Sequence, residues 1–227
     1  MYIPKAFEVS ERRTLHEFIE AHSFATIVSN GEGGIAASHL PLMLERAGAA
    51  NGTLAGHFAR ANDHWRQLEH NRDCLAIFSG PHSYISPTWY ANAPAVPTWN
   101  YAAVHVYGRA RIIDDPVWVT GLLDRMIAVH EARLDKPWPG ILPVEFRAKL
   151  TQAVVGFEIR IERIEGKFKL GQNRPLEDQV GALRNLEISA NPGARALADF
   201  TRRHLALADP QSEPLAHADV STRAPHH

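Results

Sequence analysis

Apolar stretches of strand length, joined by short turns, dominate the first sixty residues. Residues 24–29 are apolar with β-branched side chains, and residues 35–44 have the composition of a returning strand. The segment between them, 30–34, is Asn-Gly-Glu-Gly-Gly, whose residues tolerate the positive φ of hairpin turns. A second turn at 48–52 leads to a further strand at 53–58. Because strands joined by tight turns pair antiparallel, this pattern predicts an antiparallel sheet.

The rest of the chain adds longer strands and several helices. Residues 154–170 alternate apolar and charged side chains, which is typical of a strand with one face in water. Ser10 is expected to cap the first helix and Asn62 the second. The other strands are predicted at 74–79 and 102–113, and the helices at 10–22, 62–71, 116–134, 143–152, 175–187 and 192–207. Strands followed by helices predict a mainly β fold, an antiparallel barrel with peripheral α-helices.

The length of 227 residues suits one generous domain with a tail. We predict a domain over residues 1–187 and a helical extension over residues 188–207. From residue 208 onward periodicity disappears and Pro, Ser, Asp and His dominate, so residues 208–227 are predicted to be a disordered tail.

Composition excludes several classes of protein. The formal net charge is −1, so bulk charge gives no support to a nucleic-acid surface. The single cysteine, Cys74, cannot form an internal disulfide and is expected to be a small buried apolar residue. No apolar stretch reaches membrane-spanning length, so we expect a soluble cytoplasmic protein. No phosphate-binding glycine motif or zinc-ligand spacing is present, and no metal site is predicted.

Residues 80–101 combine aromatic rings with prolines that stiffen the backbone. The rings are those of Tyr84, Trp89, Tyr90, Trp99 and Tyr101. Hydroxyl and amide groups lie between them, so the segment has the composition of a wall for a flat, amphipathic ligand. The alternative is a packed loop whose rings fill the core of the barrel.

Residues 56–62 contain the elements of an anion site. They lie where a predicted strand leads into a helix, so small residues, backbone amides and Arg60 come together. Ser38 and His39, on the preceding hairpin strand, would face the same cavity. Alternatively, Arg60 is a surface cation and Asn62 only a helix cap. A second cationic stretch at 167–174 is a further ligand anchor or a weak nucleic-acid patch, or else its charges serve only helix capping and solubility.

Taken together, these segments resemble the PaiB-type FMN-binding negative transcriptional regulators. The segments are Ala37–Leu42, Gly56–Asn62, Gly80–Tyr90, Val96–Tyr101 and Lys167–Asn173, and the resemblance extends from Met1 to about Leu186. Gly171 departs from the Ser-Gln-Asn form of the last segment. The resemblance implies a split β-barrel of the flavin-reductase-like kind, a homodimer with FMN in its interface, and a link to repression of protease production and sporulation genes.

The resemblance also implies roles for particular residues. Arg60 and Asn62 would hold the FMN phosphate, and Ser38 and His39 would line the flavin. Five residues would form the wall along the isoalloxazine ring or the ribityl chain: Tyr84, Ser86, Trp89, Thr98 and Trp99. Three residues would close the site from the partner subunit: Lys169, Gln172 and Asn173.

Other functions stay open at this point. The protein could be a redox sensor or an FMN-dependent oxidoreductase, and the absence of a recognisable general acid or base leaves open whether it is an enzyme. A haem-binding or haem-degrading split barrel would use His39, His57 or His82 as the axial ligand. Direct binding of DNA is a further alternative, although the sequence contains no helix-turn-helix signature.

Overall fold

The computed structural model describes residues 1–205 and 207, and its centre is one antiparallel sheet. The strand order is β3-β2-β6-β7-β8-β5-β4, and β1 pairs with β8. The strands are β1 (Glu8–Val9), β2 (Phe24–Gly31), β3 (Gly34–Pro41), β4 (Met43–Glu45), β5 (Thr53–Ala59), β6 (Asp73–Ile85), β7 (Thr98–Ile113) and β8 (Val154–Lys169). The predicted mainly β, antiparallel fold is confirmed.

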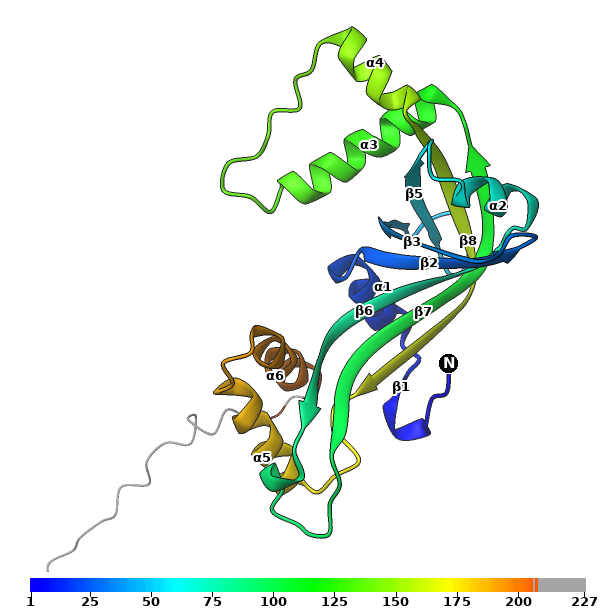
Figure 1. The fold of residues 1–227 in the computed structure, drawn as a ribbon. Coiled ribbons are helices and arrows are strands. Elements are labelled where there is room, and N and C mark those ends of the chain that lie inside the picture. Colours follow the sequence, from blue (N-terminus) through cyan, green and yellow to red (C-terminus); the bar gives the residue numbers. More distant parts are fainter. Residues whose placement is uncertain (206, 208–227) are drawn as a thin grey trace, which may run out of the picture.

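The helices lie around this sheet, with α3 and α4 at one end, α5 and α6 at the other and α1 near the middle (Figure 1). They are α1 (Arg12–Ala21), α2 (His64–His70), α3 (Pro116–Glu131), α4 (Val144–Gln152), α5 (Leu176–Glu187) and α6 (Pro192–Leu205), with short 3₁₀ turns at Lys5–Phe7 (η1) and Pro87–Trp89 (η2). The upper half of Figure 1 holds β2 to β5 with α2, α3 and α4. The long strands β6, β7 and β8 continue into the lower half, where α5 and α6 cover them.

The alternation of side chains along β7 separates two faces of the sheet. Ala102, Val104 and Val106 are buried, whereas His105 and Tyr107 between them are only half-buried. Because successive side chains point to opposite faces of a strand, the buried set forms the core. The other face, here called the outer face, carries the row Thr26, Ile77 and His105, which lie directly opposite one another on β2, β6 and β7.

Several element boundaries differ from the prediction. The strand expected at 74–79 continues to Ile85, because a bulge between Ser79 and His82 accommodates the proline at position 81. The strand expected at 35–44 divides into β3 and β4 around the buried Leu42. Helix α1 is capped by the carboxylate of Glu11, which accepts a hydrogen bond from the backbone amide of Arg13 at 2.9 Å, and not by Ser10.

The two last helices belong to the same packed core as the sheet. Leu183 and Leu186 of α5 and Leu197 of α6 join the large apolar cluster that also contains Phe78 and Phe168. The boundary at residue 187 stays a prediction, and the predicted tail at 208–227 lies outside the described residues. Within residues 1–205, no helix is both long and apolar enough to cross a membrane.

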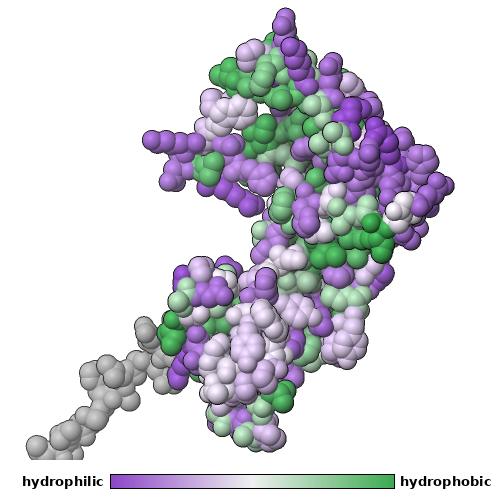
Figure 2. All heavy atoms as spheres, in the orientation of Figure 1, coloured by the Kyte–Doolittle hydropathy of each residue, from purple (hydrophilic) through white to green (hydrophobic). Residues whose placement is uncertain are grey.

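Helices α3 and α4 project from the upper end of the sheet. The inner side of α3 packs Leu122 and Met126 against Ala55 of β5. Figure 2 shows apolar side chains on the surface of this helical pair, and Val144 and Phe146 of α4 are among the exposed residues. One side of the pair is therefore anchored to the sheet and the other faces solvent.

The packing around Gly108 allows a test of the pairing register between β7 and β8. Gly108 lies at the bulge where the β7–β8 ladder shifts, and a Cβ there would overlap the carbonyl oxygen of Arg160. Overpacking of this kind costs about 2 kcal/mol. We expect Gly108→Ala to lower Tm by roughly 5 °C in thermal unfolding.

The matched control is Gly33→Ala in the β2–β3 turn, where a Cβ would meet no atom within 4 Å. It should leave Tm nearly unchanged. A Gly108→Ala protein as stable as the wild type would contradict the described β7–β8 register.

Candidate functional site

The residues predicted to form the site lie in two groups on the sheet. Ser38 and His39 lie on β3, and Arg60 and Asn62 lie between β5 and α2, in the part of the molecule with β2 to β5, here called the barrel half. The others lie at or beyond the far ends of β6, β7 and β8. His39 shares its row with His105 of β7, and Trp99 precedes His105 by six residues. At about 3.3 Å per residue along the strands, His39 lies about 20 Å from Trp99, whereas Arg60, which contacts Asp114 beyond the other end of β7, lies about 50 Å from it. One chain therefore does not bring all the predicted residues together.

Arg60 is held by the protein itself. Its guanidinium donates to both carboxylate oxygens of Asp114, at 2.5 and 3.0 Å, and to the carbonyl oxygens of Gln152 and Val154. The negative charge of Asp114 offsets the positive charge of the guanidinium. Arg60 in turn lowers the pKa of the Asp114 carboxyl through their hydrogen bond. The side chain is still 38% exposed. A ligand phosphate would therefore share Arg60 with Asp114.

Ser38 and Asn62 belong to a buried network centred on His64, which the sequence analysis did not select. The Asn62 amide donates to Ser38 Oγ at 3.1 Å, and Asn62 Oδ1 accepts from the His64 backbone amide. His64 Nδ1 lies 2.9 Å from Ser38 Oγ, and Nε2 lies 2.9 Å from Ser29 Oγ. Burial lowers the pKa of His64. This network fixes the start of α2 against β2 and β3.

His39 has a different environment from its neighbour Ser38. Because alternate residues of β3 face opposite sides, Ser38 is buried and His39 is exposed on the outer face. Its ring stacks on Phe24 of β2 at 6.4 Å between centroids, and Phe24 is itself 66% exposed. His39 and Phe24 thus give the barrel half an exposed aromatic surface.

Four rings form an aromatic platform at the far end of the outer face: His82, Tyr84, Trp99 and Tyr101. Tyr84 lies directly opposite Trp99, and His82 opposite Tyr101, across the β6–β7 ladder. Tyr84 and Trp99 are 44% and 53% exposed and meet edge to face at 6.4 Å. A hollow of about 320 Å³ lies beside His82, Trp99 and Tyr101. The platform can stack a planar ring system.

Lys169 lies at the edge of this platform. Its ammonium donates to Thr98 Oγ1 and, at 2.8 Å, to the carbonyl oxygen of Trp99. Burial, followed by the charges of Lys167 and Arg174, lowers the pKa of Lys169. Thr98 and Lys169 were predicted to reach the site from different subunits, but they meet within one chain, where they place a cation next to the exposed rings.

The remaining predicted residues have structural contacts. Ser86 Oγ accepts from the Thr88 amide and caps η2, while Trp89 packs against the core. The Gln172 side chain donates to the carbonyl oxygen of Phe168 and accepts from the amide of residue 170, so it closes its own turn. Asn173 is exposed. Ser86, Trp89 and Gln172 thus support the segments next to the aromatic platform.

Asp178 of α5 holds the connection between η2 and β7. Its carboxylate is buried and accepts 3.0 Å hydrogen bonds from the backbone amides of Ala91 and Asn92 and from the Asn92 side chain. Burial disfavours the charged form, but these hydrogen bonds and Arg174 outweigh it, so the pKa of Asp178 is lowered. The segment behind the platform is thus fixed at a defined position.

The described residues fit a flavin better than a metal. A planar, phosphorylated cofactor needs exposed rings that can stack on it and lysine or arginine side chains that can bind its phosphate, and both are present. Within residues 1–205, no three His, Cys, Asp or Glu side chains cluster as metal ligands. Cys74 is buried, as predicted, and burial raises the pKa of its thiol to about 12, so it is not a reactive thiolate.

Comparison with known proteins gives a consistent result. Residues 1–163 match the family described as "Putative FMN-binding domain". The chain is 37% identical to the protease synthase and sporulation protein PAI 2 of Bacillus subtilis, over 88% of this chain and 96% of that protein.

Solved structures show the same fold at low sequence identity. The flavocytochrome Anf3 of Azotobacter vinelandii is 17% identical with a TM-score of 0.53, over 74% of this chain and 72% of that chain. The FAD and haem binding protein of Mycobacterium smegmatis is 16% identical with a TM-score of 0.53, over 77% and 79%. The sheet is thus the split barrel that was predicted.

The His64 network predicts a pH dependence of stability. The pKa of His64 is below the usual 6.5 in the folded protein, so the unfolded chain binds the proton at higher pH. Stability therefore falls as the pH drops below about 6.5, by up to about 1.4 kcal/mol per pH unit for one such proton. We expect His64→Gln to flatten this fall in denaturant unfolding between pH 7.5 and 5.5.

Burial likewise lowers the pKa of His22, His57, His105 and His204, so some pH dependence should persist in the variant. His130→Gln on the exposed side of α3 is the control and should follow the wild-type curve. An identical pH dependence for His64→Gln and the wild type would contradict a buried, neutral His64.

Proposed function

Because the chain belongs to the PaiB-like family of FMN-binding domains, we propose that it binds FMN as a cytoplasmic homodimer and acts as a redox sensor or negative transcriptional regulator. The flavin-binding character follows from the family, and the choice of FMN over FAD is the proposal. Bound flavin would supply electron or hydride transfer. The regulatory role is supported by the resemblance to the PaiB type and by the similarity to PAI 2.

One observation carries the proposal of a shared site. Within the barrel group (Ser38, His39, Arg60 and Asn62), His39 lies on the same outer face as the aromatic platform, about 20 Å from it along the strands. A two-fold axis through the outer face would bring the platform of one copy towards the barrel group of the other. Phe24 and Ile35, which are 66% and 80% exposed, give this face the apolar residues that an interface needs.

The barrel group would bind the phosphate. Asn62 and Arg60 lie beside the start of α2, and Arg60 keeps part of its guanidinium accessible. His39 would line the flavin from the outer face of β3, and Ser38, which is buried on the opposite face, would act indirectly through its hydrogen bond with Asn62. An incoming phosphate would displace Asp114 from one side of Arg60, so Asp114 sets the affinity by competing for the same donors.

The platform of the second copy would cover the ring system. Trp99 and Tyr84 present exposed ring faces, and Lys169 places a positive charge beside them. Thr98 orients this ammonium group. Ser86, Trp89 and Gln172 would act indirectly, by holding the wall in place, and Asn173 would contribute its exposed amide.

Flavin titration tests this assignment. We expect the protein to bind FMN with a flavin absorbance band, and Arg60→Ala to weaken FMN binding about tenfold, because a charged hydrogen bond contributes about 1.5 kcal/mol or more. Asp114→Asn removes the competing carboxylate and should tighten FMN binding severalfold. Riboflavin, which lacks the phosphate, should respond to neither change.

Arg46→Ala is the matched control, because Arg46 makes a similar bidentate pair with Glu20 on α1. It should leave FMN affinity unchanged. Undiminished FMN binding by Arg60→Ala would remove Arg60 from the site, and a haem Soret band in place of the flavin band would contradict the proposal.

A further inference from the structure

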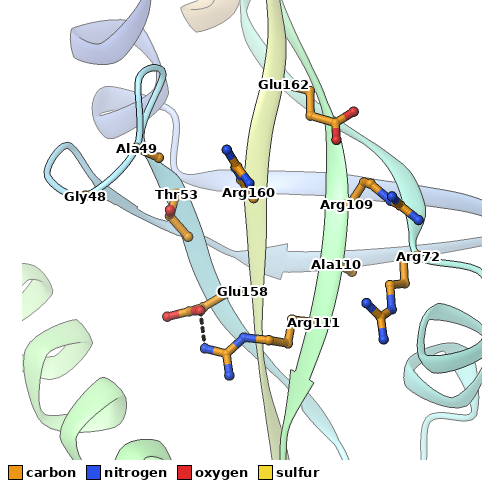
Figure 3. A pocket seen from close by; sticks show the side chains of 10 residues that line it. All are labelled: Gly48, Ala49, Thr53, Arg72, Arg109, Ala110, Arg111, Glu158, Arg160 and Glu162. Atoms are coloured by element: carbon orange, nitrogen blue, oxygen red, sulfur yellow. Dashed lines mark hydrogen bonds and ion pairs between the residues drawn. The ribbon is translucent and has the colours of Figure 1, made fainter.

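Four arginine side chains surround a hollow of about 600 Å³ on the outer face of β5, β8 and β7 (Figure 3). They are Arg72, Arg109, Arg111 and Arg160. Two glutamates, Glu158 and Glu162, also line the hollow, so the arginines exceed the acidic groups by two. The candidate flavin site described above uses none of these residues.

The strand register places two of these cations in direct opposition. Arg109 of β7 lies opposite Arg160 of β8, with Thr53 of β5 completing the row. Side chains in such positions have Cβ atoms about 5 Å apart, and like charges there destabilise a sheet. Of the two, only Arg109 has an ion-pair partner among the described residues, the exposed Asp73. Their juxtaposition is therefore better explained by an anion that binds between them.

The cations of the hollow are only partly neutralised by the protein. Arg111 donates to Glu158 at 2.7 Å, as Figure 3 shows. Arg109 approaches Asp73 at 3.4 Å, but both side chains are at least 60% exposed, and such pairs are weak. Among the described residues, Arg72 and Arg160 form no ion pair. Positive charge is thus left available at the rim.

The floor of the hollow leaves room for a ligand. The small residues Gly48, Ala49 and Thr53 line it on the β5 side, and the side chain of the lining residue Ala110 belongs to the core. The carbonyl oxygen of Arg72 is held in place by the Ala110 amide at 2.7 Å. The volume is within the range of small-molecule sites and exceeds that of a single phosphate. Guanidinium groups bind phosphate oxygens in a bidentate manner.

We propose that this arginine cluster binds a diphosphate group, free or carried by a small organic molecule, at a site separate from the flavin. Thr53 is six residues from Ala59 on β5, which places the hollow about 20 Å from Arg60. Arg109 is ten residues from Trp99 on β7, about 33 Å from the aromatic platform. The inference does not depend on the proposed function.

Calorimetric titration of the full chain with pyrophosphate, at constant ionic strength, tests the proposal. The wild type should bind pyrophosphate with a rise in Tm, and Arg109→Ala/Arg160→Ala should bind it at least tenfold more weakly. The variant loses a repulsive pair, so its Tm without anion should equal or exceed that of the wild type. Arg13→Ala on α1, also an exposed arginine, is the matched control and should bind like the wild type.

Titration with ADP and with adenosine identifies the source of the diphosphate. Tighter binding of ADP than of pyrophosphate indicates an organic ligand, and equal or weaker binding indicates the free anion, whereas adenosine alone should not bind. The proposal is overturned if the wild type binds neither pyrophosphate nor ADP, or if the double variant binds them unchanged. Displacement of pyrophosphate by equimolar FMN would also overturn it, because the two sites would then be one. Failure of FMN to bind would leave these results unaffected.

Discussion

The ladder that joins β6, β7 and β8 is the constraint on which the rest of the structure depends. These strands continue from the barrel half into the lower half of the molecule, so one register sets the positions of both. On the inner face they bury Phe78, Val104 and Phe157, which holds the core together. On the outer face the same strands carry His105, Trp99 and Arg109. In these three strands the core and the proposed ligand contacts thus lie on opposite sides of the same backbone.

Much of the fold could be predicted because the turns and the alternation are local signals. The hairpin at 30–34 and the alternating pattern at 154–170 both correspond to the structure. The prediction failed where tertiary contacts override local rules. The strand predicted at 74–79 continues to Ile85, because a bulge between Ser79 and His82 accommodates Pro81. Gly171, the one departure from the family pattern, has φ of +89°, a conformation that favours glycine.

The site was less predictable, because its contacts join residues far apart in the sequence. The types of residue around Arg60 suggested an anion site, but only the structure shows Asp114 against the guanidinium. His64 was overlooked since its partners lie on two other strands. The arginine cluster required the β7–β8 register, which composition does not reveal. Lys169 and Thr98 were assigned to different subunits, whereas the structure joins them within one chain, where their contact links β8 to the start of β7.

The central claim is that one flavin site is built from two copies of the chain. Subunit mixing tests it directly: Arg60→Ala protein is combined with Trp99→Ala protein, and bound flavin is measured after exchange. After exchange of equal amounts, half of the dimers contain one copy of each variant. If the platform of one copy completes the site at the barrel group of the other, each mixed dimer has one intact site of its two. About a quarter of the wild-type flavin sites then return. No recovery over the separate variants would contradict the account, because both defects would then belong to a site within a single chain.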